Sequence, residues 1–146
     1  MSTAITDKRL LTSTTDREHF KKIFSMIDKV PGFPYTSKEF LVWWIKNYSE
    51  KYFRVWIEID ESQNEIYSFM VAQIVKPLLE DEVFIPITYV DPKSDICHEF
   101  LKCAEGWAHV KGIKRISAYV YRNPAGFCEK YNFSKGHTEI YKNLIY

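Results

Sequence analysis

Apolar residues recur at helical spacing in two stretches of the N-terminal half of the chain. In the first, Thr15 and Glu18 have the spacing of a capping box, and the positions behind them predict a helix that stops at a Pro-Gly-Phe-Pro run. In the second, Thr36 and Glu39 repeat the capping signal ahead of another apolar helical face. Residues 8–13 precede both helices and are predicted to form a short first strand.

The pattern then changes from a helical period to alternation. Apolar residues occupy every second position over 53–59, which predicts a half-buried strand, and a polar turn leads to a more apolar strand over 66–75. The two strands indicate an antiparallel hairpin. A third strand is expected over 83–90, and it contains Pro86, which cannot donate to a ladder. A proline there implies an edge strand, a bulge or a point where neighbouring strands part.

Helical spacing returns after the third strand. A helix is expected from Cys97 to a stop at Gly112, with Ser94 or Asp95 as its N-cap. This helix would join the third strand to the last part of the chain.

The last part of the chain combines two strands with one short helix. Residues 116–121 are predicted to form a strand, after which Asn123 is a good helix cap and Pro124 suits the first helical position. The helix is expected to end near residues 131–132, and 137–145 follow as a final strand. Strands and helices in this order predict an α/β domain with a mixed sheet.

Composition narrows the class of protein. The chain has 146 residues, of which 46% are hydrophobic, so we expect a single domain over residues 1–146 with a substantial core. The formal net charge of +1 gives no electrostatic reason to expect a nucleic-acid or membrane partner. No N-terminal signal and no apolar run near ~20 residues is found, and the three cysteines are an odd number. A cytoplasmic protein with reduced thiols is the simplest interpretation.

The cysteines and histidines do not predict a metal site. Cys97, Cys103 and His109 follow one another at intervals of six residues along the predicted helix. At about 100° per residue they point to three different faces, so they cannot converge on one ion. A Cys–His nucleophile pair stays open, although no flanking signature supports it.

Several motifs of the C-terminal half resemble those of one enzyme family. In order they are "ITYVDP", "FLKCAEGWAHVKGIKRI", "SAYVY", "RNPAGFCEKYNF" and "HTEIYKNL". This series resembles the GNAT superfamily of N-acyltransferases by motif over residues 82–146, and by element order alone before them. The resemblance implies an α/β (α+β) fold, with a mixed, mainly antiparallel central sheet flanked by helices. It also implies acetyl-CoA as co-substrate and no metal.

The resemblance gives the unusual proline a function. In GNAT proteins two neighbouring parallel strands part at a bulge, and the pantetheine arm of acyl-CoA inserts between them. The strand with Pro86 and the strand that ends at Tyr121 match this pair. The residues implied to line the pocket are Ile87, Thr88, Tyr89 and Val90 on one side, and Asn123 and Phe127 on the other.

The stretch that would hold the CoA pyrophosphate departs from the family. GNAT proteins use a glycine-rich turn before the central helix, because glycines let free N–H groups approach an anion. Here that turn is formed by Lys93, Ser94, Asp95 and Ile96, without glycine. We expect the Asp95 carboxylate to cap the helix and to repel a pyrophosphate, with Lys93 offsetting part of the charge.

The groups for proton transfer are also changed. Many GNAT members place a tyrosine directly after the helix aromatic, where it protonates the departing thiolate, and Cys128 has that place here. Tyr131 is a second candidate acid, and its alternative role is packing against Phe127. The alternative for Cys128 is a small core residue. Glu58 and Glu82 are candidate bases for the amine, and the alternative for both is a solvated strand-end carboxylate.

The connection between the first two helices is a candidate acceptor site. It carries Phe33 and Tyr35, and we group Tyr121 with them as substrate-binding residues. The alternative is a turn whose aromatics are tucked into the core. The predicted activity is transfer of an acetyl or other acyl group from acyl-CoA to a small-molecule or peptide amine. The alternative is an inactive GNAT-fold binding or structural module that has lost CoA affinity. GNAT-like domains often dimerise, so a homodimer is open as well.

Overall fold

A computed structural model describes residues 9–121, 123–136, 142 and 144 of the chain. The predicted order of elements is confirmed as far as α4, and the predicted strand over 137–145 lies outside the described residues apart from 142 and 144. The elements are β1 (Arg9–Ser13), α1 (Arg17–Met26), the short 3-10 helix η1 (Ile27–Lys29), α2 (Ser37–Asn47), β2 (Phe53–Asp60), β3 (Glu65–Val75), β4 (Glu82–Tyr89), α3 (Cys97–Val110), β5 (Ile116–Ala118) and α4 (Pro124–Tyr131).

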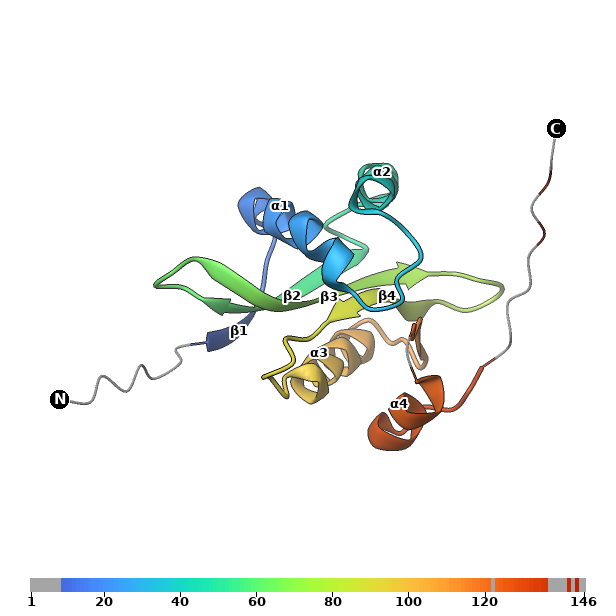
Figure 1. Cartoon of the computed structure of the whole chain (residues 1–146). Coiled ribbons are helices and arrows are strands. Elements are labelled where there is room, and N and C mark those ends of the chain that lie inside the picture. Colours follow the sequence, from blue (N-terminus) through green and yellow to red (C-terminus); the bar gives the residue numbers. More distant parts are fainter. Residues whose placement is uncertain (1–8, 122, 137–141, 143, 145–146) are drawn as a thin grey trace.

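One twisted sheet separates two layers of helices (Figure 1). Its five strands lie in the order β1-β2-β3-β4-β5, and all neighbours are antiparallel except β4 and β5, which are parallel. Helices α1 and α2 cover one face, and α3 and α4 cover the other (Figure 1). The expected mixed, mainly antiparallel sheet between helices is therefore confirmed. In the described part of the chain, no helix combines the length and apolar character needed to cross a membrane.

Each face of the sheet has its own core. The first core lies under α1 and α2 and contains Phe20, Trp44 and Ile57, and the second lies under α3 and contains Trp56 and Phe100. The expectation of a half-buried β2 was wrong, because Trp56 and Glu58 are also buried. Alternation along a strand marks two faces, but it does not say whether the second face is covered.

The N-terminal helices begin at different kinds of cap. The predicted capping box of α2 is confirmed, with Thr36 and Glu39 bonding each other's backbone N–H groups. The box predicted at Thr15 was wrong, because Asp16 is the N-cap and its carboxylate accepts from the Glu18 N–H. An aspartate one residue later satisfies the same free helix N–H groups as well as a threonine does.

The start of α3 also differs from the prediction. Neither Ser94 nor Asp95 is the N-cap; Ile96 has that position and makes no side-chain cap bond. Ser94 instead accepts a hydrogen bond from the Ile96 N–H, and Asp95 is exposed. The end of the helix agrees with the prediction, since Gly112 follows it at φ +69°, which a glycine adopts without strain.

Candidate active site

Strands β4 and β5 pair over three positions and then part. The ladder joins Val83–Ile116, Phe84–Ser117 and Ile85–Ala118, and the Tyr119 N–H donates to the Ile85 carbonyl at 3.1 Å. Pro86 follows at once, and β4 continues to Tyr89 while β5 ends at Ala118. The expectation of a strand over 116–121 was therefore too long. The prediction that the strands diverge at Pro86 is confirmed.

A bulge in β4 lies at the point of divergence. The register with β3 shifts between the Val71–Ile87 and Gln73–Phe84 pairs, so β4 has one residue more than β3 there. Such an insertion reverses which face the following side chains occupy. Ile85 accordingly belongs to the second core, whereas Ile87 belongs to the first.

The parting strands leave a cavity of about 210 Å³, which we call the slot. Its lining comes from both faces of the sheet, because Val30 and Pro31 precede α2 on one side and Cys97 and Leu101 belong to α3 on the other. The slot therefore passes through the sheet. The lining residues are Val30, Pro31, Met70, Ile85, Thr88, Val90, Cys97, Leu101, Ala118, Tyr119, Val120, Tyr121 and Phe127.

Tyr121 bridges the gap between the separated strands. Its hydroxyl donates to the Pro86 carbonyl at 2.7 Å, so the chain after β5 stays tied to the bulge without closing the ladder. Burial raises the pKa of Tyr121, and the neighbouring phenols of Tyr119 and Tyr35 add to the shift. The group therefore remains a protonated donor at neutral pH.

The α1–α2 connection packs directly on Tyr121. Gly32 has φ +75°, and a Cβ at this position would lie 2.8 Å from the Tyr121 carbonyl oxygen. The Phe33 ring meets the Tyr121 ring edge-on, with 5.2 Å between centroids. Glycine is thus required for the close approach that places this connection at one end of the slot.

The other end of the slot lies against α3 and α4. Tyr131 of α4 lies next to Cys97 of α3, which lines the slot. Burial raises the pKa of Tyr131 to about 12, and its interaction with Cys97 adds to the shift. Burial also raises the pKa of the Cys97 thiol. Phe127 packs on Tyr131 at 4.8 Å between centroids, as the spacing along α4 predicts.

A buried carboxylate fixes the loop that leads into α3. Glu58 accepts hydrogen bonds from Ser68 at 2.7 Å and from Ser94 at 2.8 Å, and Arg9 lies 4.0 Å away. Arg9 also bonds Asp91 at 2.8 Å. These contacts hold the loop to the sheet without any glycine. Because Ile96 makes no side-chain cap bond, the first N–H groups of α3 are not capped by Asp95 as expected.

Only some of the predicted cofactor-binding residues line the slot. Thr88, Val90 and Phe127 do, whereas Ile87 is fully buried in the first core and Tyr89 packs against it. Asn123 caps α4 by accepting from the Gly126 N–H at 3.2 Å.

The predicted catalytic residues lie in different places. Tyr131 does not line the slot but lies next to Cys97, which does. Cys128 is half-buried one turn before Tyr131 and does not line the slot either. Glu82 lies at the closed end of the β4–β5 ladder, where Ser117 donates to it at 2.7 Å and Arg115 lies at 3.4 Å. Of the predicted acceptor-site residues, Tyr121 lines the slot, Phe33 packs on it, and Tyr35 packs on Phe33 and is exposed.

Sequence reasoning missed part of the lining. Cys97 was interpreted as a helix position and rejected as a metal ligand, Val30 as the last apolar position of a helix, and Pro31 as part of the helix stop. The approach of the α1–α2 connection to Tyr121 depends on long-range packing, for which the only sequence signal is Gly32 beside Pro31. No group of three His, Cys, Asp or Glu side chains within the described residues is placed to hold a metal ion.

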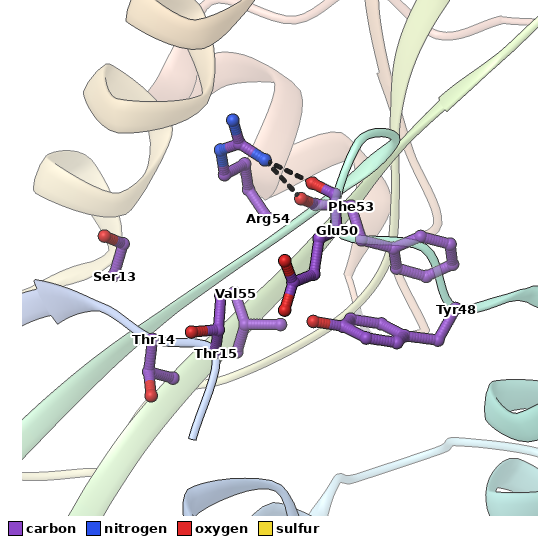
Figure 2. A pocket seen from close by; sticks show the side chains of 8 residues that line it. All are labelled: Ser13, Thr14, Thr15, Tyr48, Glu50, Phe53, Arg54 and Val55. Carbon is purple, nitrogen blue, oxygen red and sulfur yellow. Dashed lines mark hydrogen bonds between the residues drawn. The ribbon is translucent and has the colours of Figure 1, made fainter. Parts of the chain in front are cut away.

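A second cavity of about 310 Å³ lies between the end of β1 and the start of β2, away from the slot. Figure 2 shows the Glu50 carboxylate and the Tyr48 hydroxyl pointing toward one another in it, while Arg54 turns away. Arg54 donates to the carbonyls of Glu50 and Phe53, both at 2.8 Å. None of the predicted site residues lines this cavity. The slot, which unites several of them, is therefore the candidate active site.

The chain is similar to known proteins in its fold, whereas comparison of its sequence finds no match. No family model and no curated protein matches the chain. The structure is similar to an aminoglycoside 6'-N-acetyltransferase from Acinetobacter haemolyticus, with a TM-score of 0.73, 13% identity, and coverage of 94% of this chain and 99% of that one. It is also similar to an acetyltransferase from Clostridium acetobutylicum with acetyl-CoA, with a TM-score of 0.72, 14% identity, and coverage of 92% and 96%.

A third similar structure is an aminoglycoside N-acetyltransferase in complex with a bisubstrate analogue of CoA and acetylneamine. Its TM-score is 0.67 at 13% identity, with coverage of 94% of this chain and 98% of that one. At these identities the likeness establishes the fold. The chain has the fold of these acetyltransferases, which agrees with the GNAT-like fold that the sequence motifs predicted.

Proposed function

We propose that this GNAT-fold chain is an N-acyltransferase that uses acetyl-CoA or another acyl-CoA to acylate a small-molecule or peptide amine. The observation that carries the proposal is the slot, where β4 and β5 part at Pro86. A pantetheine arm is narrow, and its amides need backbone partners. A strand released from its neighbour offers such partners at its free edge. The similar structures with CoA-type ligands support this use.

The N-terminus of α3 is the proposed place for the CoA pyrophosphate. Helix N–H groups attract anions, and here Asp95 does not occupy them. Lys93 is exposed in the same loop and adds a positive charge. Glu58 accepts a hydrogen bond from Ser94 and so holds the loop to the sheet, in a turn that contains no glycine.

Acyl transfer in the slot needs a proton donor for the leaving thiolate. The amine nitrogen forms a bond to the acyl carbon, the carbon–sulfur bond breaks, and the thiolate takes up a proton. We assign this proton to Tyr131, because its phenol is protonated at neutral pH and its side chain lies next to a thiol that lines the slot. Cys128 is the second candidate. Glu82 receives no role in the proposal, since Ser117 and Arg115 already engage it at the closed end of the ladder.

The acid assignment is tested by Tyr131→Phe. Loss of a general acid lowers kcat by about 10²-fold or more. The KM for acetyl-CoA should change little, because the ring and its packing on Phe127 are retained. An unchanged kcat in this variant, together with a reduced kcat in Cys128→Ala, would transfer the role to Cys128.

Acetyl-CoA binding tests the function itself. At about 100 times its Kd a ligand adds about 2.7 kcal/mol to stability, which raises the melting temperature by about 5–10 °C for a chain of this size. Ala118→Phe should abolish the shift, because Ala118 lines the slot where the ladder ends. Ala125→Phe is the matched control, since Ala125 is exposed on α4. No shift with acetyl-, succinyl- or longer acyl-CoA would contradict the proposal and favour a binding module without CoA affinity.

A further inference from the structure

Four aromatic residues lie at the end of the slot that faces the α1–α2 connection. Two of them line the slot, Phe33 packs on Tyr121, and Tyr35 packs on Phe33. We call Phe33, Tyr35, Tyr119 and Tyr121 the aromatic rim. Neighbouring rings in it lie between 5.2 and 6.3 Å apart by their centroids. Tyr35 is 57% exposed and Tyr119 is 52% exposed, so the rim presents ring surface to an incoming molecule.

The rim packs on side chains behind it. Phe33 packs on the buried Phe40 with 6.1 Å between centroids, and Phe84 meets Tyr119 edge-on at 4.7 Å. The bond from Tyr121 to Pro86 fixes the third side. A preformed aromatic surface needs little ordering when it binds an apolar group.

Charged side chains are absent from the described lining of the slot, which contains no Asp, Glu, Lys or Arg. The groups that shift the pKa of Tyr121, besides burial, are phenols. Two carboxylates lie near the α1–α2 connection in the sequence. Glu39 is engaged in the cap of α2, and Asp28 is exposed in η1.

We infer that the acceptor is a primary amine attached to an aromatic or other apolar group, and not a polycation such as an aminoglycoside. The inference rests on the proposed function. Bringing several ammonium groups into an uncharged site costs free energy unless carboxylates compensate it. A single amino group can lose its proton when it leaves water, while its apolar substituent gains area on the rim.

The same surroundings account for deprotonation of the amine. An ammonium group taken out of water loses solvation, which lowers its pKa. Its proton is released to the solvent at the rim. A neutral amine, the form that attacks a thioester, is therefore favoured at the rim without a carboxylate base. This agrees with the position of Glu82 at the closed end of the ladder.

Three acceptors test the inference at saturating acetyl-CoA, with thiol release as the readout. Phenylethylamine and ethanolamine share an aminoethyl group and differ in apolar area, and neamine is a polycation. We expect kcat/KM for phenylethylamine to exceed that for ethanolamine by about 10- to 100-fold, from burial of the phenyl ring. Neamine should be used less well than phenylethylamine. Equal values for phenylethylamine and ethanolamine, or a preference for neamine, would overturn the inference.

Variants at Tyr35 locate the effect on the rim. Because Tyr35 is exposed, Tyr35→Ala should fold normally and lower kcat/KM for phenylethylamine by about 5-fold, from lost ring contact. Tyr35→Glu should lower it as well and raise the use of neamine, since it adds a carboxylate. Tyr52→Ala removes a similarly exposed ring outside both cavities and should leave kcat/KM unchanged. Equal loss in Tyr35→Ala and Tyr52→Ala would contradict the assignment.

Failure of the inference and failure of the proposed function give different results. If acetyl-CoA does not shift the melting temperature, the proposed function fails and the inference fails with it. If acetyl-CoA binds and neamine is the better acceptor, the function stands and the inference is wrong. If acetyl-CoA binds and no amine is acetylated, calorimetry of phenylethylamine with the protein–CoA complex decides. Binding supports the rim as the amine site, and no binding overturns it.

Discussion

The hydroxyl of Tyr121 should contribute measurably to stability, because it makes a side-chain hydrogen bond across the separated strands. Tyr121→Phe removes its bond of 2.7 Å to the Pro86 carbonyl and keeps the ring against Phe33. Leaving one buried hydrogen-bond partner unpaired costs about 1–3 kcal/mol. The neighbouring slot of about 210 Å³ has room for a water molecule that restores the bond. The expected loss is therefore at the lower end, about 1 kcal/mol.

This loss can be measured by thermal unfolding and urea denaturation of the protein without ligand. A destabilisation of about 1 kcal/mol lowers the melting temperature by about 3–4 °C for a domain of this size. Tyr52→Phe is the control, because it removes a phenol hydroxyl from an exposed ring and should stay within about 0.5 kcal/mol of the wild type. The KM for acetyl-CoA should rise in Tyr121→Phe and not in Tyr52→Phe.

An unchanged melting temperature in Tyr121→Phe would refute this reasoning. It would mean that the hydroxyl and the Pro86 carbonyl do not depend on each other, and that other contacts set the spacing of β4 and β5. A loss well above about 3 kcal/mol would also contradict it, because it would show that water does not replace the hydroxyl.

Three further predictions concern the frame of the site. Gly32→Ala should lower the free energy of unfolding by about 2–4 kcal/mol, because the residue has a positive φ and its new Cβ would clash. Gly112→Ala, at a similar φ with nothing near its Cβ, should lower it by about 1 kcal/mol. Equal losses in denaturant unfolding would exclude the clash. Glu58→Ala should cost about 3 kcal/mol or more by urea denaturation, because it leaves the hydroxyls of Ser68 and Ser94 without their acceptor and removes a carboxylate near Arg9. A loss below about 1 kcal/mol would show that the network is not stabilising. The folded pKa of Tyr131 is raised from 10.0 to about 12, so its contribution is complete below pH 10 and is lost as the pH rises toward 12. The melting temperature of the wild type should therefore fall between pH 10 and pH 12, and that of Tyr131→Phe should fall less steeply. Parallel curves of melting temperature against pH for the two proteins would contradict the raised pKa.

The order of elements was predictable because each depends on local signals. Pro86 marked β4 as an edge, a bulge or a point of parting, since a residue without an N–H cannot continue a ladder on both sides, and the resemblance to GNAT proteins selected the parting. Asn123 and Pro124 marked the start of α4 for the same kind of reason. These signals need no knowledge of the rest of the fold.

The lining of the slot was less predictable because it depends on packing between distant segments. The bulge moves Ile87 and Tyr89 into the first core and leaves Thr88 and Val90 in the slot, and a one-residue insertion in β4 has no clear sequence signal. The pairing of Cys97 with Tyr131 joins two helices whose relative placement the sequence does not state. The cap expected at Asp95 failed because α3 begins later than predicted, with Ile96 as its N-cap and Asp95 exposed.

Hydrogen exchange at β4 tests the central claim most directly. If acyl-CoA inserts where the strands part, amides of residues 87–90 should exchange more slowly in the presence of acetyl-CoA, and those of residues 48–55 at the second cavity should not. Protection of residues 48–55 alone, or binding of acetyl-CoA with no change at residues 87–90, would contradict the account.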